Sequence, residues 1–169
     1  MDLNQPSPDF ELSDLEGRRC RLSDYRGRIV ILNFWSCECP HSERTDRNLL
    51  ALCVQWPDDL VLLPVAANRI ETPQALAEAA LARHIPRVLT DNQLTVADMF
   101  AAKTTPHAYV IDRQGILRYR GAIDDVGLRQ RRPTRFYLDE AVEALLYGRL
   151  PPVPETQPFG CSIVREALE

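Results

Sequence analysis

The residue types that could do chemistry gather in one short segment of the chain. Cys37, Cys39 and His41 occupy alternating positions there, and Pro40 separates the second cysteine from the histidine. The deprotonated thiolate is the form of cysteine that attacks disulfides and binds metals, and a protonated histidine beside a thiol favours that form. We therefore interpret Cys39 as a nucleophilic thiol and His41 as a neighbour that lowers its pKa.

The elements around Cys39 strengthen this interpretation. Residues 29–35 are apolar apart from Asn33, which is typical of a strand buried on both faces of a sheet. Residues 40–56 start with a proline, repeat apolar positions at helical spacing and stop at Pro57, which predicts a helix. Cys39 then lies between a central strand and a helix N-terminus, where the helix dipole and the free amides stabilise an anion.

The remaining pattern predicts an α/β fold. Short apolar runs alternate with amphipathic stretches, so a parallel strand–helix–strand half is followed by an antiparallel hairpin and a last helix. The predicted fold is a mixed central sheet with helices on both faces and an N-terminal hairpin. The expected elements are a hairpin at residues 10–22, strands at 29–35, 60–67, 88–90, 107–112 and 116–120, and helices at 40–56, 72–84, 96–100 and 134–147, the last of them capped by Thr134.

Composition and charge narrow the function. The chain has 169 residues, 45% of them apolar, which fits one soluble domain with a sizeable core. Its net charge of -4 and the lack of a long lysine or arginine run predict no binding to nucleic acid and none to a membrane surface. Because no signal peptide is visible at the start, we expect a cytoplasmic protein, in which five cysteines indicate chemistry rather than a framework of structural disulfides.

The last part of the chain differs in composition from the rest. We place a domain at residues 1–150 and a proline-rich arm at residues 151–169. The prolines at the start of this arm predict an extended conformation, and the arm then carries Phe159, Cys161 and Ile163. Because apolar side chains at the end of an arm are unfavourable in water, we expect the arm to dock on the domain.

Four stretches of the chain resemble one known protein class. Residues 33–42, with the sequence Asn-Phe-Trp-Ser-Cys-Glu-Cys-Pro-His-Ser, resemble the active-site segment of thioredoxin-fold proteins of the redoxin class, which includes the TlpA/ResA-type thioredoxins and the AhpC/TSA peroxiredoxins. Residues 22–28 resemble the lead-in to that segment, and residues 104–112 resemble the cis-proline segment with the strand that follows it. Residues 119–125 together with 153–161 resemble a bacterial subgroup of the class.

The resemblance implies a thioredoxin fold with Cys39 as the redox-active thiol. It also implies a cis bond before Pro106, which presents the backbone of Thr105 to a substrate strand. His107 could donate a proton to a leaving thiolate. The candidate substrate contacts are Trp35, Pro40, Thr105, Pro106 and His107.

Departures from the class limit what can be carried over. Thioredoxins have a second cysteine three residues after the first, where this chain has Ser42. Peroxiredoxins have a proline where this chain has Leu32, and a peroxide-activating arginine where it has Pro106. The chain is therefore closer to the thioredoxin-like branch, but the usual resolving thiol of that branch is missing.

A cycle of disulfide exchange needs a second thiol, and the sequence offers two. Cys37 would close a very small and strained ring with Cys39. Cys161 is on the arm that we expect to dock, and the resembling subgroup has a cysteine there. We favour Cys161 and keep open Cys37 or no partner at all. Cys20 and Cys53 are interpreted as packing or surface residues.

The leading hypothesis is a thiol-disulfide oxidoreductase that needs no cofactor. Its partners would be a disulfide-containing protein or a small thiol or peroxide substrate, together with a thiol electron donor. One alternative is a thiol peroxidase in which Cys39 passes through a sulfenic acid. Another is a thioredoxin-fold copper- or zinc-binding protein that uses Cys37, Cys39 and a histidine, whereas the leading hypothesis assigns no metal site.

Overall fold

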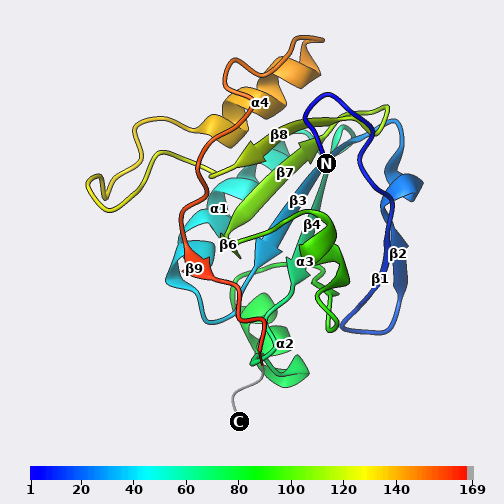
Figure 1. Ribbon diagram of the computed structural model, residues 1–169, viewed down its shortest axis with the longest axis vertical. Coiled ribbons are helices and arrows are strands. Elements are labelled where there is room, and N and C mark those ends of the chain that lie inside the picture. Colours follow the sequence, from blue (N-terminus) through cyan, green and yellow to red (C-terminus); the bar gives the residue numbers. More distant parts are fainter. Residues whose placement is uncertain (167–169) are drawn as a thin grey trace.

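The fold is built on one mixed sheet. The computed structural model describes residues 1–166, and its seven-stranded sheet has the order β2-β1-β5-β4-β3-β7-β8 (Figure 1). β3 and β4 run parallel at the centre, and β7 and β8 extend the sheet in antiparallel pairing on one side. The predicted mixed sheet and N-terminal hairpin are confirmed. The strands of this sheet are β1 (Glu11–Asp14), β2 (Arg19–Arg21), β3 (Ile29–Trp35), β4 (Leu60–Ala66), β5 (Leu89–Thr90), β7 (His107–Ile111) and β8 (Leu117–Gly121).

Helices cover both faces of the sheet, as predicted. The helices are α1 (Pro40–Gln55), α2 (Pro73–Ala82), α3 (Thr95–Met99) and α4 (Tyr137–Leu146), and a short 3-10 helix, η1 (Leu22–Tyr25), follows β2. Alternate side chains of the fully buried β3 pack into two clusters: Ile31 contacts the faces of α1 and α4, and Phe34 packs near Phe100 at the end of α3. Figure 1 shows α1 behind the sheet and α3 in front of it. Within residues 1–166, no helix is long and apolar enough to cross a bilayer.

The starts of α1 and α2 follow the local sequence. A proline occupies the first helical position in both, where its missing N–H costs no hydrogen bond. Cys39 is the N-cap residue of α1, so this thiol lies at the junction of β3 and α1 that the sequence predicts. Thr72 caps α2, because its hydroxyl oxygen accepts a hydrogen bond of 3.1 Å from the amide of Ala75.

The start of α4 differs from the prediction. The helix begins at Tyr137, and its N-cap residue, Phe136, makes no capping hydrogen bond through its side chain. The Asp125 carboxylate instead accepts hydrogen bonds from the amide (2.8 Å) and the hydroxyl (2.6 Å) of Thr134. The prediction that Thr134 caps this helix is wrong, because a tertiary contact engages the side chain that would have done so.

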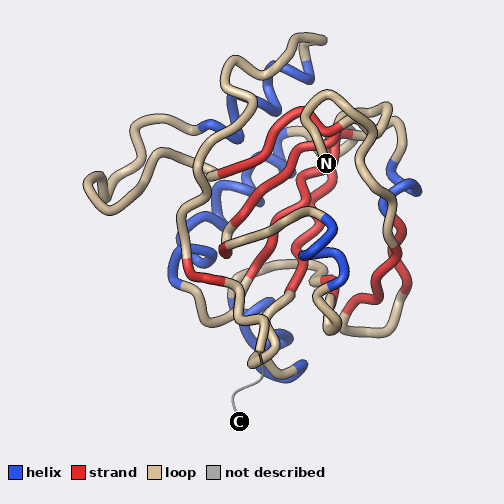
Figure 2. The backbone as a smooth tube through the Cα atoms, viewed as in Figure 1, coloured by secondary structure: helices blue, strands red, loops and turns tan. Residues whose placement is uncertain are grey.

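The C-terminal arm crosses the domain. It first runs beside β8, where the amide of Arg120 donates to the carbonyl of Pro154 and the amide of Thr156 donates to the carbonyl of Arg120, both at 3.1 Å. It then forms β9 (Cys161–Ser162), which pairs antiparallel with β6 (Thr104–Thr105). Figure 2 shows the arm as a long loop interrupted by this one short strand. Beyond β9, Ile163 is buried in the hydrophobic core. Residues 167–169 of the predicted arm lie outside the described part of the chain.

Candidate active site

Cys39 lies where β3, α1 and the cis-proline segment meet. Its side chain is buried, with 2% of its surface exposed. The Cys39 sulfur is 3.0 Å from the carbonyl oxygen of Thr105 and 2.6 Å from the sulfur of Cys161. The bond between Thr105 and Pro106 is cis, as predicted. The fold thus brings together two thiols that are 122 residues apart in the sequence.

The surroundings of Cys39 favour its thiolate. Burial by itself would raise the pKa of the Cys39 thiol, but hydrogen bonds from the Cys161 thiol and from the backbone amides of Ser42 and Cys161 outweigh it, so the pKa lies below its ordinary value. The pKa of the Cys161 thiol moves the other way, raised by burial and by the neighbouring Cys39. Of the two thiols, Cys39 therefore loses its proton at the lower pH and is the stronger nucleophile.

Cys37 is two residues from Cys39, but its surroundings favour the protonated thiol. Burial raises the pKa of Cys37 to about 12, and the facing carboxylate of Glu71, which accepts a hydrogen bond from this thiol, adds to the rise. A thiol with such a pKa stays protonated at neutral pH and is a weak nucleophile. The geometry therefore argues against Cys37 as the second thiol, a possibility that the sequence left open.

Two residues at opposite ends of α2 hold the loop that precedes Cys39. The Glu71 carboxylate accepts hydrogen bonds from the amides of Cys37 (2.8 Å) and Glu38 (3.3 Å), and from the hydroxyl of Ser36. The Arg83 guanidinium donates to the carbonyls of Ser36 (3.1 Å) and Cys37. Sequence reasoning missed both residues, because no spacing pattern links them to a loop so distant in the chain.

Trp35 is fully buried beneath this loop, so its prediction as a substrate contact is wrong. Its indole N–H donates a hydrogen bond of 3.0 Å to Asp46 of α1, and the Arg83 guanidinium lies over its ring at 5.3 Å from the centroid. Burial raises the pKa of Asp46 to about 6, although the hydrogen bond from Trp35 and the charge of Arg83 oppose the rise. Trp35 supports the reactive segment from below instead of lining a binding surface.

The two predicted histidines contact groups other than the reactive sulfur. His41 packs edge-on against Phe159 of the arm, with ring centroids 4.9 Å apart, and the main contributions to the lowered pKa of Cys39 come from other groups. His107 is buried, which lowers its pKa to about 4, and its Nδ1 accepts a hydrogen bond of 3.2 Å from the amide of Lys103. A histidine that is neutral at pH 7 and engaged in this way is a poor proton donor to a leaving thiolate, which argues against the role predicted for His107.

The arm occupies the backbone edge that the resemblance assigns to a substrate strand. Cys161 lies directly opposite Thr105 in the β6–β9 register, and both Thr105 and Pro106 are buried. Gly160 approaches so closely that an added Cβ would lie 2.1 Å from the Thr105 carbonyl oxygen, so only glycine fits there. Of the predicted substrate contacts, Pro40 in the first turn of α1 is exposed.

The copper or zinc site considered above would need sulfur and imidazole ligands around one point. The Cys39 sulfur instead faces Cys161, the Cys37 thiol faces Glu71, and the ring of His107 bonds to backbone. In the part of the chain that the structure describes, no group of three or more histidine, cysteine, aspartate or glutamate side chains is arranged to hold a metal ion.

Comparison with known proteins agrees with this geometry. The model of the AhpC/TSA family matches residues 3–120. This chain belongs to the AhpC/TSA family. The matched region contains the β3–α1 junction with Cys39 and the cis-proline segment, as in the resemblance that the motifs indicated, whereas the arm with Cys161 lies outside it.

Some proteins similar to this AhpC/TSA protein are named thiol-disulfide oxidoreductases, and others are solved structures with the same fold. The thiol-disulfide oxidoreductase ResA of Geobacillus thermodenitrificans is 35% identical over 112 residues, which are 64% of this chain, and the chain spans only 63% of the length of that relative. A crystal structure of an uncharacterized conserved protein from Geobacillus kaustophilus matches this chain with a TM-score of 0.88 and 25% sequence identity. The match covers 99% of this chain and 94% of that protein's chain. The thioredoxin domain of a thiol-disulfide oxidoreductase from Bacteroides vulgatus has a TM-score of 0.62 and 19% identity, over 69% of this chain and 86% of its own. The predicted thioredoxin fold is confirmed.

Proposed function

We propose that this protein is a thiol-disulfide oxidoreductase in which Cys39 is the nucleophile and Cys161 is the second thiol of an intramolecular cycle. The observation that carries the proposal is the 2.6 Å separation of the two sulfurs. The opposite shifts of their pKa values support it, because one thiol is activated while the other keeps its proton. The β6–β9 pairing supports it further, because a resolving thiol must reach the first sulfur without a large rearrangement.

The proposed reaction transfers two electrons to a substrate disulfide. The Cys39 thiolate attacks one substrate sulfur, a mixed disulfide forms on Cys39, and the other substrate sulfur leaves as a thiolate. The Cys161 thiol then loses its proton to solvent and attacks the Cys39 sulfur. The second substrate thiolate leaves, and a Cys39–Cys161 disulfide remains. A thiol electron donor reduces this disulfide and completes the cycle.

The arm controls access to the site in this scheme. Cys39 is buried and Cys161 is partly exposed, so a substrate disulfide reaches Cys39 when β9 separates from β6. A reducing thiol, by contrast, attacks the oxidised pair at Cys161. That attack expels Cys39, and the thiolate with the lower pKa is the better leaving group. The partners in this scheme are a disulfide-containing protein or a small disulfide, and a thiol donor.

Mass-spectrometric mapping of disulfides after mild diamide oxidation tests the proposal. We expect a Cys39–Cys161 bridge in the wild type and in the matched control Cys53→Ala, which removes a cysteine of α1. In Cys161→Ala, we expect Cys39 to remain in a mixed disulfide with an added small disulfide. A bridge from Cys39 to Cys37 in the wild type would overturn the assignment of Cys161. A Cys39 sulfenic acid that persists in the wild type after peroxide treatment would favour a thiol peroxidase instead.

A further inference from the structure

An arginine-rich loop lies between β8 and α4. Arg129, Arg131 and Arg132 are exposed in it, and Leu128 has 91% of its surface exposed. Arg135 pairs with Glu140, whereas no carboxylate of residues 1–166 lies within ion-pair distance of the other three arginines. The loop does not form a long lysine or arginine run, because a glutamine, a proline and a threonine interrupt its arginines.

Internal hydrogen bonds give this loop a defined shape. The Asp125 carboxylate accepts from the amide and the hydroxyl of Thr134, and the amide of Gly127 donates to the carbonyl of Gln130 at 2.8 Å. The Asp125 amide also donates to the carbonyl of Arg135 at 3.1 Å. A loop closed in this way is already ordered at its base. The binding of a partner to its arginines therefore costs less conformational entropy.

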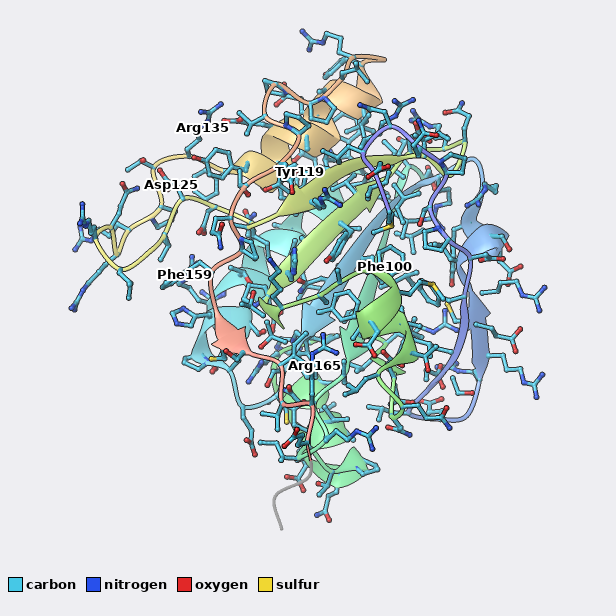
Figure 3. The ribbon with its side chains drawn as sticks, in the orientation of Figure 1. Phe100, Tyr119, Asp125, Arg135, Phe159 and Arg165 are labelled. Atoms are coloured by element: carbon cyan, nitrogen blue, oxygen red, sulfur yellow. The ribbon has the colours of Figure 1, made fainter. Side chains whose placement is uncertain are left out.

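The base of the loop is tied to the helix that carries the reactive cysteine. Asp124 is buried and accepts two hydrogen bonds from the Arg44 guanidinium, at 2.6 and 3.0 Å. Arg44 follows Cys39 by five residues in the sequence, which corresponds to about 8 Å along the axis of α1. Figure 1 shows the loop projecting from the edge of the molecule along which β9 runs, and Figure 3 labels Asp125 and Phe159 along that edge.

The positive charge of the loop indicates which class of partner it binds. Guanidinium groups bind carboxylates through paired hydrogen bonds, and three free ones stand out on a chain whose net charge is -4. A nucleic acid binds through many phosphate contacts along a wide basic surface, which a chain with a net charge of -4 and three neighbouring arginines does not favour. An acidic protein segment needs only a local match, and the exposed Leu128 adds an apolar contact to it.

We propose that loop 128–135 docks an acidic segment of the thiol protein that exchanges electrons with Cys39 and Cys161. This inference rests on the proposed function and names the partner class of the same site. The partner carries a run of glutamate or aspartate near its reactive cysteine. The loop holds that run while the partner thiol attacks the partly exposed Cys161 sulfur of the oxidised pair.

Peptide thiols of different charge test this proposal. Each peptide has one cysteine followed by a run of glutamate, lysine or serine, and the oxidised full chain is the target. Acid quenching and intact-mass measurement give the rate at which a mixed disulfide forms. We expect the glutamate peptide to react about tenfold faster than the serine peptide at low ionic strength, and the advantage to vanish at high salt. Equal rates for the three peptides in the wild type would overturn the proposal.

Two matched variants assign the effect to the loop. The triple variant Arg129→Gln, Arg131→Gln and Arg132→Gln should lose the advantage of the glutamate peptide. The control Arg18→Gln, Arg19→Gln and Arg21→Gln removes the same charge from the β1–β2 hairpin, at the opposite edge of the sheet from β8, and should keep it. An equal loss in the control would mean that overall charge, not the loop, sets the preference, and would overturn the proposal.

Two further measurements separate the possible failures. Dithiothreitol, a neutral dithiol, should reduce the bridge at the same rate in all three proteins. If no Cys39–Cys161 bridge forms in the wild type, the proposed function fails, and fluorescence anisotropy with a glutamate peptide in which cysteine is replaced by serine still tests the loop. Loop-dependent binding of that peptide would support the proposal, and its absence would overturn it. A short DNA duplex that binds the loop more tightly than the peptide would also overturn it.

Discussion

Cys37 and Cys39 are separated by one residue, yet the structure places them in opposite electrostatic surroundings. Cys39 is the N-cap residue of α1, where the Cys161 thiol and backbone amides lower its pKa. Cys37 is in the preceding loop, where burial and the Glu71 carboxylate raise its pKa to about 12. The comparison teaches that reactivity is assigned by the groups that surround a sulfur, because both residues have the same side chain and nearly the same position in the sequence.

The largest expected effect separates the two cysteines by activity. In Cys39→Ser, we expect the reduction of bis(2-hydroxyethyl) disulfide, measured with dithiothreitol as donor, to fall by about a thousandfold or more, because the attacking thiolate is gone. Cys37→Ser should stay within about twofold of the wild type, since its thiol is protonated in the native protein. Similar losses in the two variants would break the comparison.

The pH dependence of alkylation should separate them next. Only the thiolate reacts with iodoacetamide, so the rate at Cys39 should rise as pH increases through its lowered pKa and level off above it. The rate at Cys37 should still be rising near pH 10, because its pKa is about 12. Site-resolved mass spectrometry measures both curves. A midpoint for Cys39 at or above about 8.5, the ordinary value for cysteine, would contradict the lowered pKa.

The arm limits the access of reagents to Cys39 and not to Cys37, and the substitution Gly160→Ala should change that access. The added methyl group collides with the Thr105 carbonyl, so we expect β9 to separate from β6 more often and Cys39 to be alkylated about tenfold faster. The rate at Cys37 should not change. Gly127→Ala is the matched control, because a Cβ there meets nothing within 4 Å. If Gly160→Ala leaves the Cys39 rate as in this control, the arm does not limit access.

The smallest expected effect concerns the carboxylate beside Cys37. Glu71→Gln keeps an oxygen that accepts from the loop amides and removes the charge, so the pKa of Cys37 should fall and its alkylation near pH 9 should increase about fivefold. The midpoint of Cys39 should move less. Glu78→Gln, at an exposed site on α2, is the control and should change neither cysteine. An unchanged Cys37 rate in Glu71→Gln would show that burial alone sets its pKa.

Patterns within single elements made much of this molecule predictable. The apolar run of β3, the proline at the start of α1 and the cap of α2 are local features, and each predicted its element correctly. Thr134 illustrates the limit, because the same residue type that could cap a helix bonds to Asp125 across the loop instead. The two-residue strands β6 and β9 were missed for a related reason, since each exists only by pairing with the other.

The candidate site divides in the same way. An apolar strand followed directly by a helix that starts with proline is a local sequence feature. The sequence alone therefore identifies Cys39 as the thiol at a helix N-terminus. Its partner sulfur, the Glu71 and Arg83 contacts on the preceding loop, and the burial of Trp35 and His107 depend on contacts between distant segments. Desolvation and hydrogen bonding act through space over a few ångströms, so only the folded chain decides which thiol keeps its proton and which one loses it.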